Sequence, residues 1–314
     1  MNKQRYFLTA SVLLLLMTSG AQASSQGTGV TTTSDRVVSY QYETTRRLVD
    51  LVNDAAALTH KEGKKAFTRF SEPGSRWFHD GTYLFIYNTK GECVFEPVPP
   101  CEPGKSYLDL RDFDGKPMVK RMVDLISQGP GATDWFFYLW KDGMQFNPIW
   151  KSVYARSVVA PSGEHWVIGS GLYNLRVERE FLRRRVDLAA TRLEQQGWET
   201  AFQEFRDPSS PFVFLGSYIF VLNMRGQMIV DPVSPGETGR SLMNFKDAMD
   251  KPVVKSILVK LQDTDAAWVQ YKWPEPGTRV LGRKVVYVRK VETPQGTVIV
   301  GADAFLASPI WMRG

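Results

Sequence analysis

Two stretches of the chain carry apolar residues at the three- and four-residue spacing of an amphipathic helix. The first runs from about residue 35 to 60, with Ser34 as its expected N-cap, and the second from about 175 to 196. The apolar positions are Val38, Leu48, Leu51, Val52, Ala55 and Leu58 in the first stretch, and Val177, Phe181, Val186, Leu188, Ala189 and Leu193 in the second. A short second helix is expected after each, ending near Phe70 and Phe205, because a proline soon follows.

Strand-like segments follow each helical part. Residues 82–88 and 217–223 are apolar and aromatic, and a turn ending in glycine leads from each to a second segment, 93–96 or 228–231. A proline then opens an expected helix at 117–127 or 252–261. The closing strands are expected at 135–141, 149–159 and 165–171, and at 267–273, 284–291 and 297–301. Helices first and strands afterwards predict an α+β fold with antiparallel sheets.

The two halves of this pattern are copies of each other. Residues 83–119 match 218–254 at a constant offset of 135, without gaps, and fourteen of the 37 positions are identical. Farther on, Tyr138, Trp140, Tyr154 and Arg156 recur at an offset of 133. A repeat this long has the size of a whole domain. We therefore predict two tandem domains, at residues 34–173 and 174–308.

The N-terminus has the pattern of a signal peptide, residues 1–25. Lys3 and Arg5 precede a short apolar run, and Ala21-Gln-Ala23 supplies small residues at the expected cleavage positions. An uncleaved anchor is the alternative, although the run is short for a membrane span. No later apolar run is long enough to span a membrane, so we expect a periplasmic protein with no transmembrane segment after cleavage.

The formal charge of +6 is modest, and basic and acidic residues are interspersed. The dense basic cluster at Arg179, Arg183, Arg184 and Arg185 lies in a helical pattern, so we interpret it as a solvated helix face and expect no nucleic-acid partner. We expect no metal site and no cofactor, because the three histidines have no recognisable ligand spacing.

The chain has two cysteines, Cys93 and Cys101, on either side of a proline-rich corner. An oxidising compartment permits a disulfide between them, and two reduced thiols are the alternative. Gly169-Ser-Gly171 lacks the pattern of a nucleophile elbow, and no P-loop or histidine-containing dyad is present. We therefore expect that the protein is not an enzyme.

Alternation along the strands selects candidate ligand contacts, since every second residue shares a face. Tyr83 with Phe85, Tyr138 with Trp140, and Tyr154 with Arg156 form such pairs, and all six recur in the second half. A role in the core is the alternative for the aromatic residues, and an ion pair is the alternative for Arg156. Lys151 lies on the opposite face of its strand from Arg156, so at most one of the two can face a pocket. Asp112 is a further candidate, with helix or turn capping as its alternative.

The sequence resembles the Cache family of extracellular sensor domains. The similar stretches include Gly63-Lys-Lys-Ala-Phe67, the segment from Asp109 to Val119, and Trp166-Val-Ile-Gly-Ser-Gly171. The resemblance implies two PAS-like domains, each with a long N-terminal helix and a central antiparallel sheet. It also implies a pocket for organic acids or amino acids. Many relatives have a histidine where Glu96 and Asp231 stand here, so Glu96 joins the candidate contacts.

We therefore expect a periplasmic sensor that binds a small ligand. The first domain keeps the fuller family pattern, and we expect it to hold a carboxylate on Arg156 and Tyr154, between walls of Tyr83, Phe85, Tyr138 and Trp140. Most relatives are attached to a membrane helix and a signalling output; because the sequence carries neither, reporting to a membrane receptor or histidine kinase is expected. A non-binding scaffold protein of the cell envelope is the alternative function.

Overall fold

The structure is a computed structural model that describes residues 38–141, 147–275 and 280–306. The expected signal peptide, the N-cap Ser34 and the outermost residues of the two predicted domains lie outside these ranges. The described residues from Ser39 onward belong to one unit.

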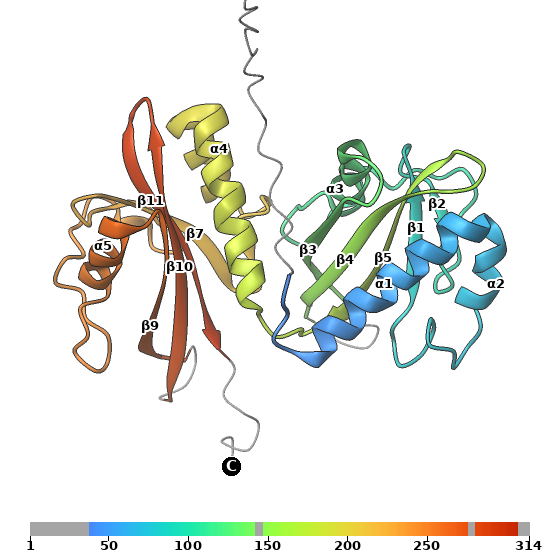
Figure 1. Cartoon of the computed structure of the whole chain (residues 1–314), viewed down its shortest axis with the longest axis horizontal. Helices are drawn as coiled ribbons and strands as arrows, with labels where there is room; N and C mark the ends of the chain where they lie inside the picture. Colours follow the sequence, from blue (N-terminus) through green and yellow to red (C-terminus); the bar gives the residue numbers. More distant parts are fainter. Residues whose placement is uncertain (1–37, 142–146, 276–279, 307–314) are drawn as a thin grey trace, which may run out of the picture. The chain divides into compact units, whose positions relative to one another are not determined.

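The first half contains one antiparallel sheet of five strands in the order β2-β1-β5-β4-β3. A long helix precedes it, and a short helix lies between its second and third strands (Figure 1). The helices are α1 (Glu43–Glu62), α2 (Phe67–Phe70) and α3 (Met118–Asp124). The strands are β1 (Leu84–Asn88), β2 (Cys93–Phe95), β3 (Thr133–Trp140), β4 (Ile149–Val159) and β5 (His165–Tyr173).

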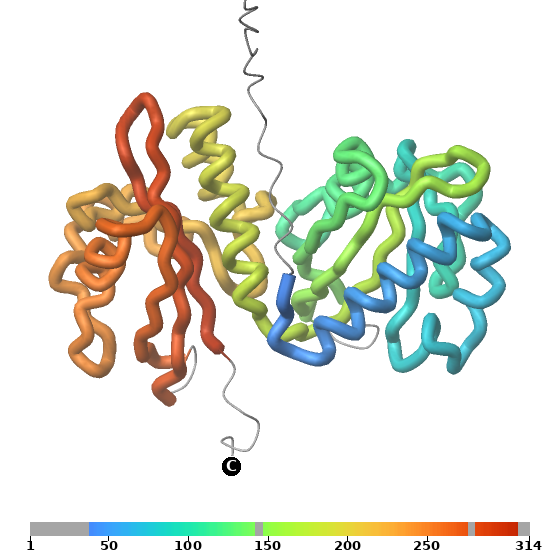
Figure 2. Tube along the Cα trace, in the orientation of Figure 1, coloured from blue at the N-terminus to red at the C-terminus, as the bar shows by residue number. Residues whose placement is uncertain are grey.

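The second half repeats this arrangement with a sheet in the order β6-β7-β11-β10-β9, and β8 pairs with β7. In the trace of Figure 2, the long helix α4 lies against β10 and β11. The helices are α4 (Arg179–Arg206) and α5 (Val253–Asp263). The strands are β6 (Val213–Phe214), β7 (Ser217–Asn223), β8 (Met228–Val230), β9 (Ala266–Pro274), β10 (Leu281–Thr293) and β11 (Gly296–Leu306).

Each sheet is covered on both faces. Leu48, Leu51, Val52 and Ala55 recur at helical spacing and give α1 one buried apolar side, which packs on β4 and β5. The other face of the first sheet packs against α3. In the second half, α4 and α5 take the corresponding places. The expected α+β class, with long helices and antiparallel sheets, is confirmed.

Equivalent polar residues make the same local bonds in both halves. The side-chain oxygen of Asn88 accepts hydrogen bonds from the backbone amides of Lys90 and Glu92, and Asn223 does the same for Arg225 and Gln227. These bonds close the turns between β1 and β2 and between β7 and β8. The shared sequence therefore produces the same turn twice.

Three details differ from or refine the sequence expectations. The helix predicted to end near residue 196 breaks at Gly197, with φ of 75° and ψ of 177°, and the expected second helix continues from there to Arg206. Cys93 and Cys101 form a disulfide, with Cα atoms 5.5 Å apart, as predicted. No helix among the described residues is long and apolar enough to cross a membrane.

The interpretation of the arginine cluster as a solvated helix face is wrong for Arg185. Its side chain is buried and donates a hydrogen bond to the carbonyl of Trp135. Arg183 and Arg184 both pair with Glu180, at 2.7 and 2.8 Å. These arginines therefore pack and form ion pairs on α4. A buried guanidinium such as that of Arg185 needs hydrogen-bond acceptors close by.

Candidate ligand-binding site

The face of the first sheet that packs against α3 collects most of the predicted contacts. Phe85, Tyr87 and Tyr138 are buried there, and Tyr83 and Trp140 are partly buried beside them. Strand alternation explains the grouping, because side chains two residues apart point to the same side of a strand. Met118 and Met122 of α3 close the cluster from above.

A buried cation lies within this group of rings. Lys151 on β4 is directly opposite Tyr138 on β3, and its side chain is only 4% exposed. Its ammonium donates a hydrogen bond to the Tyr83 hydroxyl at 3.1 Å and lies 4.9 Å from the centre of the Tyr83 ring and 5.1 Å from that of Tyr173. The Tyr83 hydroxyl and the two ring faces are neutral groups that a positive charge can approach favourably.

Glu96 follows β2 and faces the same group. Burial raises the pKa of the Glu96 carboxyl to about 7, and the positive charge of Lys151 opposes this rise. Burial and the Glu96 charge also raise the pKa values of Tyr83 and Tyr87 well above the ordinary phenol value. Near neutral pH this carboxyl is therefore poised between a hydrogen-bond donor and an anion.

Tyr154 and Arg156 do not join this group. On β4, Lys151 and Val153 face α3, so the alternating residues Tyr154 and Arg156 face α1. Tyr154 is buried in the core under α1, and Arg156 donates a hydrogen bond to the side-chain oxygen of Asn53 at 2.9 Å. The expectation that both would meet a ligand beside Tyr83 is corrected by this geometry, which puts Lys151 there instead.

Asp112 is occupied by the backbone. One carboxylate oxygen accepts hydrogen bonds from the amides of Asp114 and Lys116, and the other accepts from the amide of Leu139 on β3. Asp247 makes the equivalent three bonds in the second half. Both residues fasten the loop before the helix to the sheet. This is the role given above as the alternative, turn capping, with one added bond to a strand.

The second sheet has a cavity of about 570 Å³ on its α5 face. Tyr218, Phe220, Tyr271, Trp273 and Lys284 line it, and these residues are the repeat partners of Tyr83, Phe85, Tyr138, Trp140 and Lys151. Here the lysine has an anionic partner, because Lys284 lies 2.7 Å from the Asp303 carboxylate. Tyr271 donates a hydrogen bond to the same carboxylate at 2.5 Å. Asp303 was not among the predicted contacts, although it aligns with Gly171 in the repeat.

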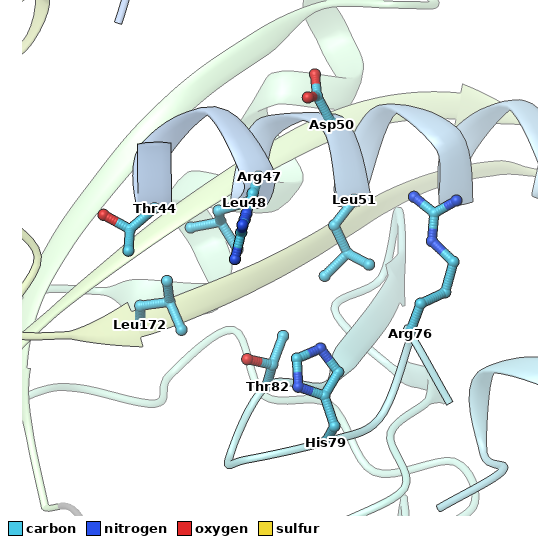
Figure 3. Close-up of a pocket in the computed structure, with 9 residues that line it drawn as sticks. All are labelled: Thr44, Arg47, Leu48, Asp50, Leu51, Arg76, His79, Thr82 and Leu172. Carbon is cyan, nitrogen blue, oxygen red and sulfur yellow. The ribbon is translucent and has the colours of Figure 1, made fainter. Parts of the chain in front are cut away.

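Two further cavities lie elsewhere on the first half. One, of about 430 Å³, lies between α1 and the segment before β1 (Figure 3). Leu48, Leu51 and Leu172 line it, while Asp50 points away from the other labelled side chains. The other, of about 380 Å³, is at the end of β3 and includes Trp140 and the occupied Asp112. Neither contains the buried lysine.

A family model described as "Cache domain" matches residues 73–302. The chain belongs to the Cache domain family. The match is one continuous stretch that includes strands of both sheets, so it does not separately establish two Cache repeats. Cache domains are sensor domains that bind ligands outside the cytoplasm, and this Cache protein carries the fold of that family.

Solved structures of sensor domains are similar to this Cache protein at low identity. A periplasmic sensor domain of a chemotaxis protein is 20% identical, with a TM-score of 0.32, and the match covers 40% of this chain and 88% of that one. The ligand-binding domain of a Pseudomonas aeruginosa PAO1 amino acid chemoreceptor in complex with GABA is 11% identical, with a TM-score of 0.30, covering 81% and 88%. At these TM-scores the likenesses carry no argument about the ligand. No curated protein matches the chain.

Proposed function

We propose that this Cache protein is a periplasmic sensor that binds a small carboxylate, either an organic acid or an amino acid, on the α3 face of the first sheet. The observation that supports the proposal is Lys151, a buried ammonium held among aromatic side chains. An ammonium group has three hydrogen-bond donors, and a ligand carboxylate would accept a charge-assisted hydrogen bond from it.

The proposed site keeps five of the predicted residues, namely Tyr83, Phe85, Glu96, Tyr138 and Trp140. Lys151 replaces Arg156 as the anchor, and the Tyr83 hydroxyl, 3.1 Å from that anchor, is a second donor. Phe85, Tyr138 and Trp140 form apolar walls. These residues suit a short organic chain with one acidic end.

Glu96 decides between the two ligand classes. With its pKa near 7, the protonated carboxyl donates a hydrogen bond and tolerates a simple organic acid. The ionised carboxylate repels a simple acid but pairs with the ammonium group of an amino acid. The site therefore favours simple acids below about pH 7 and amino acids above it.

The signalling part of the proposal rests on the family. Residues 34–173 and 174–308 are taken as two Cache repeats that follow a signal peptide at 1–25. The first repeat binds the ligand, and the bound protein reports to a membrane receptor or a histidine kinase. A scaffold protein without a ligand remains the competing function, because Phe85, Tyr87 and Tyr138 are each less than 10% exposed.

A thermal-shift screen of the exported protein tests the proposal. Short organic acids, amino acids and amines are each added at increasing concentration. A ligand that binds only the folded state raises the melting temperature by mass action. We expect at least one acid or amino acid to raise it in the wild type, and Lys151→Met to remove that rise. Silence of the whole library would favour the scaffold function.

A further inference from the structure

The cavity on the second sheet differs from the proposed first site in the charge it presents. Its floor is formed by β7, β10 and β11, and Val253, Val254 and Ile257 of α5 form one wall. Its volume of about 570 Å³ is within the range of small-molecule pockets. The basic residue that anchors the proposed carboxylate site in the first sheet is present here as Lys284, but it is already paired.

Asp303 neutralises that lysine. Lys284 and Asp303 are 17% and 18% exposed, and their charged atoms are 2.7 Å apart. The first sheet has Gly171 at the corresponding position of its strand, so no carboxylate reaches Lys151 from there. A ligand carboxylate would have to displace Asp303 to reach Lys284. The second cavity therefore does not suit the acids proposed for the first sheet.

Asp231 is the buried charged lining residue of this cavity that remains after the Lys284–Asp303 pair is set aside. The residue is only 9% exposed, and one carboxylate oxygen accepts hydrogen bonds from the backbone amides of Val233 and Ser234 at 2.9 and 2.8 Å. The other oxygen makes no hydrogen bond or ion pair within the part of the chain that the structure describes. A carboxylate oxygen of a residue that lines a cavity, with no protein partner among the described residues, is suited to a ligand donor.

The remaining charges of the lining leave this anion uncompensated. Glu237 and Arg240 at the rim pair with each other at 2.5 Å. With Lys284 and Asp303 also paired, the lining has three carboxylates against two cations and a net charge of −1. A cation is therefore the ligand charge that balances the cavity.

The walls favour an organic cation over a hydrated inorganic ion. Tyr218, Tyr271 and Trp273 line the cavity together with Phe245, whose ring centre lies 5.2 Å from that of Trp273. Aromatic faces attract ammonium groups and also cover an alkyl chain. Aromatic walls around one carboxylate are poor ligands for a metal ion, which needs several oxygen donors.

We propose that the cavity between the second sheet and α5 binds a small primary ammonium compound, with the ammonium on Asp231 and the alkyl part against Trp273 and Phe245. The protein then carries two ligand sites of opposite charge preference. The inference does not depend on the carboxylate site of the first sheet, because different residues form it.

A pair of probes with the same chain and opposite charge tests this inference: n-butylamine, which is an ammonium ion at pH 7, and butyrate. Binding to the full chain is measured by calorimetry in wild type, Asp231→Asn and Lys151→Met. Asparagine keeps the side-chain oxygen that accepts the amides of Val233 and Ser234, so this variant removes the charge with little change to the loop. We expect n-butylammonium to bind the wild type, to bind Asp231→Asn about tenfold more weakly or worse, and to bind Lys151→Met as well as the wild type.

Two more variants keep the inference testable if Asp231→Asn does not fold. Trp273→Leu changes a wall residue that is 36% exposed, and it should weaken n-butylammonium binding about threefold to tenfold. Asp303→Gly copies the Gly171 arrangement and frees Lys284, so it should allow butyrate to bind the second cavity. The inference is overturned if n-butylammonium does not bind the folded wild type, if folded Asp231→Asn and Trp273→Leu bind it undiminished, or if Lys151→Met abolishes its binding. A failure of the acid site alone would appear only as a loss of butyrate binding.

Discussion

The ammonium of Lys284 lies 2.7 Å from the carboxylate of Asp303, on the α5 face of the second sheet. In the first sheet the position equivalent to Asp303 holds no acidic residue. Gly171 takes the place of Asp303, and a side-chain carbon there would lie only 3.2 Å from Cε of Lys151 and 2.5 Å from Cγ2 of Val153. One strand position therefore separates a lysine that meets a carboxylate on the neighbouring strand from one that meets a glycine there. The proposed difference in ligand charge follows from this position.

The Lys284–Asp303 pair should contribute to stability. Lys284→Met leaves Asp303 buried without its cation, and we expect the free energy of unfolding in urea to fall by about 1–3 kcal/mol. The matched control is Lys290→Met on the same strand, whose partner Asp265 is 80% exposed, and its effect should stay below about 0.5 kcal/mol. In a double-mutant cycle, Asp303→Asn should recover part of the Lys284→Met loss. Equal effects of the two lysine variants would contradict this account.

Glu96 should make stability depend on pH. Its pKa rises from an ordinary value of 4.5 in the unfolded chain to about 7 in the folded protein, because burial disfavours the charged form. Between these two values the folded state holds a proton that the unfolded state releases, so this contribution is full below pH 4.5 and is lost as pH rises through 7. We expect the stability of the wild type relative to Glu96→Gln to fall as the pH rises through that window and to level off above it. Urea unfolding at pH 5, 6, 7 and 8 measures the difference, and a constant or opposite trend would refute the assignment.

Asp112 and Asp247 should act on stability through their backbone bonds. Each accepts hydrogen bonds from three backbone amides, so Asp112→Ala and Asp247→Ala should each reduce the free energy of unfolding by about 2–4 kcal/mol. Asp109→Ala, at an exposed position of the same loop, is the control and should change it by less than about 0.5 kcal/mol. Comparable values for Asp109 and Asp112 would show that these bonds do not hold the loop.

Local patterns in the sequence were sufficient to predict most of the fold. Helical spacing located α1 and the first part of α4, and the strand expected at 149–159 coincides with β4. The repeat predicted two antiparallel sheets whose elements follow the same order along the chain. The break at Gly197 and the helix that resumes to Arg206 agree with the expected helix to about residue 196 and the short second helix ending near Phe205.

The residues of the candidate site were harder to predict than the fold, because they depend on which helix covers each face of the sheet. Alternation shows that Lys151 and Arg156 lie on opposite faces of one strand, but it does not show which face meets α1 and which meets α3. That choice depends on how the helices pack, as the bond from Arg156 to Asn53 illustrates. The Lys284–Asp303 pair likewise joins two strands, and its distance depends on their register. The repeated lysines at 151 and 284 were the available signal.

The most direct test of the account compares two cations on opposite faces of β4. The acid or amino acid found by thermal shift is titrated calorimetrically into wild type, Lys151→Met and Arg156→Ala, each checked for an intact unliganded melting transition. If Lys151 anchors the carboxylate, Lys151→Met raises Kd roughly 10- to 100-fold, and Arg156→Ala leaves Kd within about twofold of wild type. The opposite result, full affinity in folded Lys151→Met and lost affinity in folded Arg156→Ala, would contradict the account and place the ligand on the α1 face.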